Sequence, residues 1–330
     1  MKGWIIFIVV VIAVLVIAIG LSRLNMTDQP PSDEPPTPTA SPVAVEASPS
    51  EQPTPLVRPP RVETSLSPVT AETYYMRETT YSIWPEDDVT APRTQARGRM
   101  IREDYKGARF RAYFAEPVTL RPAAGLLLVH PWWGLSSRIR KEAEQMAQRG
   151  YAVLAVDLYD GVWTTDRRRA SELMANLEQA EAVRKLQRGL DYMEEHFPHF
   201  EGKIGVIGWG MGGGFALDLA MADPRPDAVV NYYGEVSLDP NRLAQIQAPV
   251  LGVFAELDGW LTPQRIEQFV EMLEQAGLEH EVHSFLANPG FALRPQTDME
   301  EKYAQESRRI VFEFLNQHLL LAQSISGTAQ

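Results

Sequence analysis

The stretch KIGVIGWGMGGGFALDLAMA, residues 203–222, joins an apolar run to a helix-like segment through a cluster of glycines. The run 203–208 is short and almost continuously apolar, which is typical of a parallel strand buried on both faces. The glycines therefore occupy a sharp strand–turn–helix connection. A nucleophile elbow has this form, with small residues on both sides of the nucleophile. The sequence predicts such an elbow, centred on Gly210.

A glycine-rich phosphate loop is the alternative interpretation of this turn. The stretch lacks the pattern G-x-x-x-x-G-K-[ST] of nucleotide-binding loops. A dinucleotide fit to Gly208, Gly210 and Gly213 fails because these residues follow the third apolar run of the chain. No acidic residue follows at the spacing that a ribose would need. The elbow is the favoured interpretation.

Similar apolar runs recur along the chain and alternate with helical patterns. The helical pattern that contains Ile139 stops at Gly150, and the one that contains Ile266 stops at Gly277. This alternation within one unit predicts an α/β fold, a doubly wound and mainly parallel sheet with helices on both faces. The predicted strands cover residues 124–130, 152–157, 203–208, 227–233 and 249–255.

Composition excludes several classes of function. The 330 residues carry 43 acidic and 31 basic side chains, a net charge of −12, which argues against a nucleic-acid partner. The absence of cysteine excludes disulfides, thiolate metal sites and a cysteine nucleophile. The six histidines form no H-x-x-x-H pair and no H-E-x-x-H motif. We therefore expect no metal ion and no cofactor.

Further motifs occur in a fixed order around the elbow. Together they resemble the dienelactone hydrolase family of α/β-hydrolases over residues 100–322. The resemblance implies an α/β-hydrolase fold and, for the family, hydrolysis of esters or lactones. The motifs are HPWWGL (130–135), VDLYDG (156–161), YYG (232–234) and ELDGW (256–260).

The resemblance also implies that most catalytic side chains have been replaced. The family nucleophile, a cysteine or serine, corresponds to Gly210, which has no side chain. Alignment through Phe291 places Pro289 at the family histidine, and Pro131 stands where the prototype has a glutamate. Only the triad acid is retained, as Asp258. We therefore expect a hydrolase-like domain without catalytic activity.

The resemblance implies a pocket at the carboxyl ends of the strands. The backbone amides of Trp132 and Met211 correspond to the family's oxyanion donors, so binding of a carbonyl or carboxylate ligand could persist. Arg294 lies one residue out of register with a family arginine that binds substrate carboxylate. We expect two of the tryptophans at this edge, and His130, to be packing residues. The pocket candidates are His130, Trp133, Tyr159, Trp209, Trp260 and Arg294.

A displaced nucleophile would have to be a serine. Ser136, Ser137 and Ser237 fall on loops at the expected edge of the sheet. The first two are better explained as helix-capping residues. None of the histidines is placed to activate a nucleophile at the elbow.

The N-terminus predicts attachment to a lipid bilayer. Residues 4–21 form an uncharged apolar run that is long enough to span a membrane. A cleaved signal peptide, whose apolar core is usually shorter, is the alternative. Lys2 precedes the run, and no basic residue occurs between Arg23 and Arg58. This asymmetry places the N-terminus in the cytoplasm and the remaining chain outside.

The expected organisation runs from this anchor to a globular domain. The second part is rich in Pro, Ser and Thr and predicts a disordered, extended stalk. The parts are the transmembrane anchor 1–23, the stalk 24–70, a docking or extension segment 71–99, the hydrolase-like domain 100–322 and a tail 323–330.

Three functional hypotheses follow. The first is a membrane-anchored, catalytically degenerate domain that acts as a binding or scaffolding module. The second is an active ester or lactone hydrolase with a displaced nucleophile. The third is a structural subunit of an envelope complex that contacts a protein partner. The missing catalytic groups favour the first and third hypotheses over the second.

Overall fold

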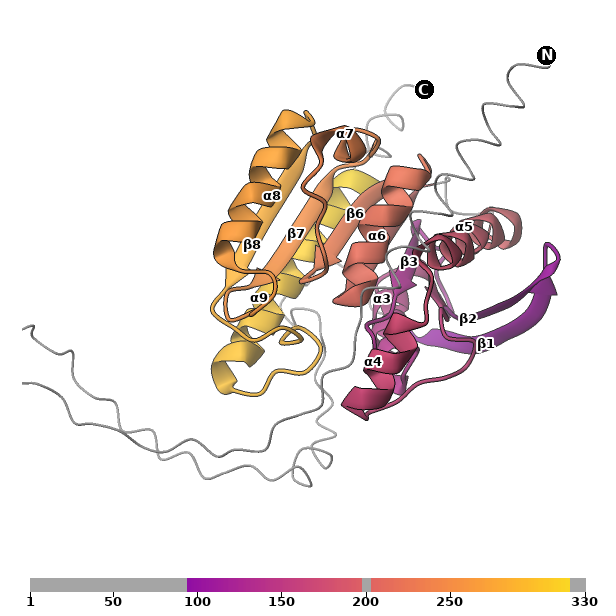
Figure 1. Cartoon of the computed structure of the whole chain (residues 1–330). Coiled ribbons are helices and arrows are strands. Elements are labelled where there is room, and N and C mark those ends of the chain that lie inside the picture. Colours follow the sequence, from indigo (N-terminus) through magenta and orange to yellow (C-terminus); the bar gives the residue numbers. More distant parts are fainter. Residues whose placement is uncertain (1–93, 198–202, 321–330) are drawn as a thin grey trace, which may run out of the picture. The chain divides into compact units, whose positions relative to one another are not determined.

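A single sheet of eight strands organises the residues that the computed structural model describes, 94–197 and 203–320. The strand order is β1-β2-β4-β3-β5-β6-β7-β8 (Figure 1). The strands are β1 (Ala96–Tyr105), β2 (Ala108–Pro117), β3 (Ala124–Val129), β4 (Tyr151–Val156), β5 (Ile204–Trp209), β6 (Pro226–Tyr232), β7 (Val250–Ala255) and β8 (His280–Phe285). The helices are α3 (Ser137–Gln148), α4 (Arg167–Ala175), α5 (Gln179–His196), α6 (Met211–Ala222), α7 (Pro240–Leu243), α8 (Pro263–Gln275), α9 (Asp298–Leu315) and the π-helix η1 (Asn316–Leu320).

The strands from β3 to β8 are parallel, and the predicted α/β architecture is confirmed. The five predicted apolar runs form β3 to β7, whose side chains are buried almost throughout. Three strands lie outside that prediction, namely the edge strand β8 and the strands β1 and β2 at the other end of the sheet. β1 and β2 form an antiparallel hairpin whose turn, Lys106 and Gly107, has positive φ at both residues, 49° and 75°. A two-residue turn of this kind matches the natural twist of a hairpin.

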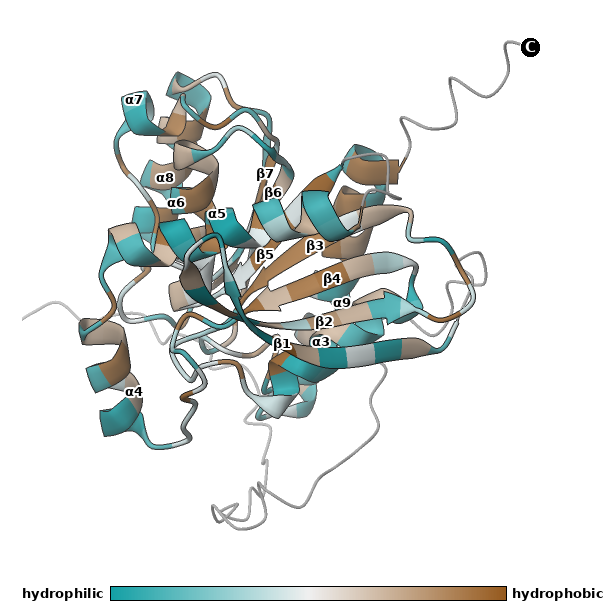
Figure 2. Ribbon diagram, turned by 90° about the vertical axis from the view of Figure 1, so that its right-hand side faces the viewer, coloured by the Kyte–Doolittle hydropathy of each residue, from teal (hydrophilic) through white to brown (hydrophobic). Residues whose placement is uncertain are grey.

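Helices cover both faces of the sheet. The side chains of α3, α9 and η1 pack with one set of strand residues, and those of α5, α6 and α8 pack with the alternate set. Figure 2 shows the hydrophobic central strands running between these helical layers. Because neighbouring side chains of a strand point to opposite faces, strands that are buried on both faces are apolar throughout.

The N-terminal predictions lie largely outside the described residues. Within 94–197 and 203–320, no helix is both long and apolar enough to cross a bilayer. The predicted anchor at 4–21, the stalk 24–70 and the tail 323–330 are not among those residues. Of the segment 71–99, the structure describes the residues from Thr94 onward, and β1 begins there at Ala96.

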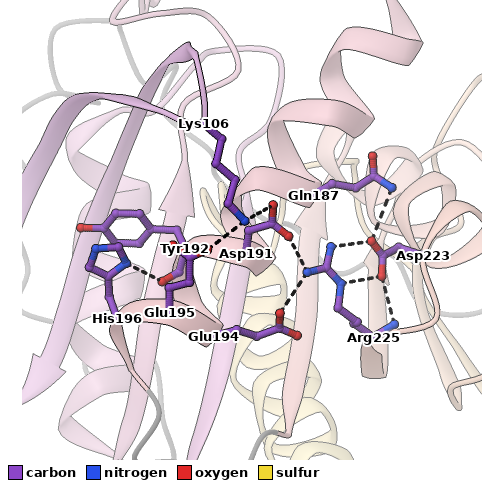
Figure 3. A network of polar contacts seen from close by, with 9 residues as sticks. All are labelled: Lys106, Gln187, Asp191, Tyr192, Glu194, Glu195, His196, Asp223 and Arg225. Carbon is purple, nitrogen blue, oxygen red and sulfur yellow. Dashed lines mark hydrogen bonds and ion pairs between the residues drawn. The ribbon is translucent and has the colours of Figure 1, made fainter.

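A network of ion pairs joins the hairpin, α5 and the loop before β6 (Figure 3). The Lys106 ammonium lies 2.9 Å from a carboxylate oxygen of Asp191, which in turn lies 2.7 Å from Arg225 Nη1. Arg225 Nη2 also contacts the largely buried Asp223 at 2.7 Å. Burial opposes ionisation of Asp223 and Asp191, but hydrogen bonds from their cationic partners outweigh it and lower both pKa values.

Replacement of Arg225 should reveal how much this network stabilises the fold. We expect Arg225→Gln to lower the free energy of unfolding by roughly 1–3 kcal/mol at neutral pH, because Asp223 is left buried without a cation. The lowered pKa values contribute stability above the ordinary aspartate value of 3.8. This stability is lost as the pH falls through the folded-state values. The free energies of unfolding of the variant and the wild type, measured with denaturant, should therefore differ most at neutral pH. This difference should become smaller as the pH falls.

The matched control is Arg168→Gln. Arg168 pairs with Glu172 on the surface of α4, and its side chain is 90% exposed. Surface pairs of this kind contribute little, so the control should remain close to the wild type at every pH. If Arg225→Gln and Arg168→Gln lowered the free energy of unfolding equally, the network would contribute no more to stability than an ordinary surface ion pair.

Candidate functional site

Gly210 forms the turn between β5 and α6 in the conformation that the elbow prediction requires. Its φ of 54° and ψ of −120° lie in a region that favours glycine. Its N–H donates to the Tyr232 carbonyl oxygen at 2.8 Å, and its own carbonyl accepts from Gly213 N–H at 2.9 Å. The sharp turn of an elbow is therefore present.

Close backbone packing explains the other glycines of the turn. A Cβ atom at Gly212 would lie 2.3 Å from the Val129 carbonyl oxygen, and one at Gly208 would lie 1.9 Å from the Gly212 carbonyl oxygen. At Gly210, in contrast, a Cβ would meet nothing within 4 Å. Space therefore remains for a side chain at the centre of the elbow. Gly210 itself offers no nucleophilic group at this position.

Two backbone amides, at the start of α6 and shortly after β3, have no hydrogen-bond acceptor among the described residues. Met211 is the first residue of α6, and the first amides of a helix have no intrahelical acceptor. Within the part of the chain that the structure describes, neither the Met211 amide nor the Trp132 amide donates a hydrogen bond. These are the two amides that, by the family resemblance, are expected to form an oxyanion hole. A helix N-terminus attracts negative charge, which suits that role.

Trp133 and Arg294 come together from distant parts of the sequence. The Arg294 guanidinium lies 5.5 Å from the centre of the Trp133 ring, within the range of a cation–π contact. The Trp132 and Trp133 rings meet edge to face, 4.9 Å apart. The Trp133 carbonyl accepts from Thr164 N–H, which brings the half-exposed Trp163 to the same edge of the sheet. Trp163 was not among the predicted site residues, although it lies shortly after the VDLYDG motif.

His130 is a structural residue and not part of a ligand pocket. Its ring is fully buried, and Nε2 accepts from Leu158 N–H at 3.0 Å. Nδ1 must then carry the proton, which it donates to the Pro131 carbonyl oxygen at 2.8 Å. Burial lowers the pKa of His130 and keeps the imidazole neutral. Tyr159 packs against this ring, and its hydroxyl lies 3.1 Å from Met211 Sδ beside the elbow.

Trp209 also belongs to the core. It is 2% exposed and stacks on Tyr232 with ring centres 5.8 Å apart. Trp209 packs with the side chains of α3 and α9, beneath the sheet edge and away from solvent. Its position as the last residue of β5 decides which face of the sheet receives it.

Asp258 and Trp260 occupy the loop after β7. Asp258 Oδ1 accepts from the backbone N–H groups of Trp260 and Leu261, at 2.8 and 3.2 Å. Within the described residues, no imidazole contacts this carboxylate. Trp260 is 71% exposed, and its Nε1 donates to Glu235, which also pairs with Arg265. Asp258 therefore stabilises its own loop.

Pro289 lies exposed on a loop that Glu300 holds in place. The buried Glu300 carboxylate accepts from the backbone N–H of Asn288 at 3.0 Å and from that of Gln296 at 2.7 Å. Thr297 caps α9 by accepting from Glu300 N–H. The sequence T-x-x-E at 297–300 could have indicated this helix start, because it matches a capping box.

No substitute for the catalytic groups lies at the elbow among the described residues. Ser136 is at the N-cap position of α3 without a side-chain hydrogen bond, and Ser237 Oγ accepts from Asp239 N–H. His280 bonds a backbone carbonyl, and His283 lies near Glu281 on the edge strand β8. Within 94–197 and 203–320, no group of three or more His, Cys, Asp or Glu side chains could hold a metal ion.

Known proteins share this fold and its sequence motifs. A solved dienelactone hydrolase from Anabaena variabilis superposes with a TM-score of 0.53 at 22% identity and covers 68% of this chain and 99% of that protein. This likeness supports an α/β-hydrolase-like fold.

Among curated proteins, "Protein usf" of Aquifex pyrophilus is 26% identical over 205 residues, which are 57% of this chain and 87% of that protein. "Carboxymethylenebutenolidase 1" of Cupriavidus pinatubonensis is 28% identical over 148 residues, which are 41% of this chain and 62% of that enzyme. Residues 110–319 match the family model of the dienelactone hydrolase family. Because this match spans more than half of the 330 residues, the chain belongs to the dienelactone hydrolase family.

Proposed function

We propose that this chain is a catalytically degenerate family member that binds a small carbonyl or carboxylate ligand without hydrolysing it. One observation carries the proposal. Gly210 occupies the nucleophile position of an elbow whose backbone conformation is retained. A glycine offers no hydroxyl or thiol, so the acyl-enzyme step on which serine and cysteine hydrolases depend cannot begin there.

The surroundings of Gly210 support this loss of activity. The family histidine position, Pro289, has no titratable side chain, and Asp258 bonds backbone amides of its own loop. An oxyanion hole and binding alone leave at most ~10³–10⁴-fold acceleration over water in enzymes that lose their triads. Ester turnover at an enzymatic rate is therefore not expected.

The groups that remain favour binding of an anion or a polarised carbonyl. The Trp132 and Met211 amides are without acceptors in the described chain, and unpaired amides at a helix start suit a carbonyl or carboxylate oxygen. Arg294 adds a positive charge on the side of the site where Trp133 lies. The ligand would place one oxygen between the amides, in the space that a nucleophile would otherwise border.

A second candidate function is hydrolysis through a displaced nucleophile. The relatives with enzyme names favour it, because the family contains carboxymethylenebutenolidases. A third candidate function is that of a structural subunit of an envelope complex, and the test for binding of a small carboxylate bears on it. The turnover experiment distinguishes the first two.

We also propose that residues 4–21 anchor the chain in a membrane and that the globular domain lies on the extracytoplasmic side. The support is the uncharged length of this run and the absence of Lys and Arg between residues 23 and 58. A tether of this kind would hold the binding domain close to the cell envelope.

The purified chain should not hydrolyse p-nitrophenyl acetate above the buffer rate. Gly210→Cys alone should also fail, because a thiol with a pKa of about 8.5 is largely protonated without a base. The double variant Gly210→Cys/Pro289→His supplies an imidazole as a base. It should release an initial burst of p-nitrophenol as the thiol is acylated, followed by slow turnover. Wild-type turnover that a serine-directed probe abolishes would establish the displaced-nucleophile hypothesis instead.

A small aromatic carboxylate such as benzoate should bind and quench tryptophan fluorescence. Arg294→Gln should weaken this binding about tenfold, because it removes a charge-assisted contact worth about 1.4 kcal/mol. Arg168→Gln, at an exposed site on α4, is the charge-matched control and should bind normally. Absence of any binding would favour the structural-subunit hypothesis.

The intact chain should remain in the membrane pellet after alkaline carbonate extraction, since a spanning helix resists this treatment. External protease should release the globular domain from spheroplasts. A mature protein whose N-terminus lies near residue 21 would identify the run as a cleaved signal peptide.

A further inference from the structure

Glu142 is a buried acid that the site described above does not use. It lies on the inner face of α3 and is only 6% exposed. Among the described residues, its carboxylate has no hydrogen-bond or ion-pair partner within bonding distance. Unpaired carboxylates are rarely retained in a protein interior, because ionisation there is costly. The side chain borders a small cavity lined also by Met146, Trp209, Tyr232, Ala292, Arg308 and Val311.

Charged and titratable groups surround Glu142 from three elements. Arg138 and Lys141 lie on α3 itself, and the largely buried Arg308 faces Glu142 from α9. The hydroxyls of Tyr232 and Tyr233 approach from the end of β6, while β5 contributes the neutral Trp209. Burial raises the pKa of Glu142 to about 7, although the positive charges of Arg308, Arg138 and Lys141 oppose the shift. Glu142 therefore changes its charge near neutral pH.

Two of these cations hold the loop that follows β8. Arg308 Nη2 donates to the Ala292 carbonyl oxygen at 2.7 Å, and Arg138 Nη1 donates to the Leu293 carbonyl oxygen at 2.7 Å. These consecutive carbonyls immediately precede Arg294, the residue that contacts Trp133. Glu300 fixes the start of the same loop through Asn288. The arginines therefore connect the surroundings of Glu142 to the edge of the candidate site.

We propose that Glu142, Arg308 and Arg138 form a pH-sensitive latch on the loop 288–294. When Glu142 is protonated, both guanidiniums hold the Ala292 and Leu293 carbonyls. When Glu142 is ionised, its buried carboxylate needs donors, and we expect it to recruit the guanidiniums of Arg308 and Arg138, whose positive charges already act on it. Their reorientation toward Glu142 weakens the hold on the loop. The loop is thus closed below neutral pH and looser above it, whether or not the site binds a ligand.

Hydrogen exchange of the full chain, read by mass spectrometry, tests the latch directly. Exchange should be followed between about pH 5 and about pH 9 and corrected for the intrinsic pH dependence of amides. Peptides covering 288–294 should lose protection several-fold with a midpoint near neutral pH. Glu142→Gln, which mimics the protonated acid, should show no such step. Glu271→Gln, at an exposed position of α8, should retain it.

Stability provides a second readout that does not depend on the loop. An acid whose folded-state pKa lies above its ordinary value of 4.5 destabilises the fold progressively as the pH rises from that value to about 7. Glu142→Gln should therefore gain thermal stability over the wild type across this range and retain the gain above it. The proposal would be overturned if residues 288–294 of Glu142→Gln still lost exchange protection near neutral pH. It would also be overturned if the difference in thermal stability between Glu142→Gln and the wild type did not depend on pH.

Discussion

The close contact between the first turn of α6 and the end of β3 is the constraint on which the site depends. A Cβ atom at Gly212 would lie only 2.3 Å from the Val129 carbonyl oxygen and 2.6 Å from that of His130, so no side chain fits there. This contact fixes where α6 begins, and with it the positive φ of Gly210 and the direction of the Met211 amide. The fully buried His130 completes the arrangement by linking the end of β3 to Leu158 after β4. The elbow thus persists through backbone packing and does not need a nucleophile to maintain it.

The proposed loss of catalytic groups would cost this fold little stability, because the backbone geometry of the turn does not depend on them. A nucleophile on a strained turn costs stability, whereas glycine adopts the same φ without strain. Pro289 sits on a loop held by Glu300, Arg138 and Arg308, and none of these contacts involves a catalytic histidine. The oxyanion amides arise from the fold itself. Binding capacity can therefore outlast the triad, which is the basis of the proposed function.

The sequence predicted the parallel sheet and the elbow because both follow from local patterns, namely buried apolar runs and glycines at a sharp turn. The faces that individual side chains occupy could not be predicted as well. Trp209 and His130 were pocket candidates, yet strand register and backbone hydrogen bonds place both in the core. Contacts between segments that are far apart in the sequence also could not be predicted from local sequence patterns. The approach of Arg294 to Trp133 and the burial of Glu142 against α9 depend on how the finished layers pack.

The proposed loss of catalysis requires that no activated nucleophile remains at the carboxyl edge of the sheet. Intact-mass spectrometry after prolonged incubation of the full chain with a fluorophosphonate tests it most directly, because this reagent labels activated hydroxyl groups regardless of the substrate. We expect an unchanged mass, with an active serine hydrolase labelled in parallel as the positive control. A stoichiometric adduct, mapped by peptide analysis to Ser136, Ser137 or Ser237, would contradict it.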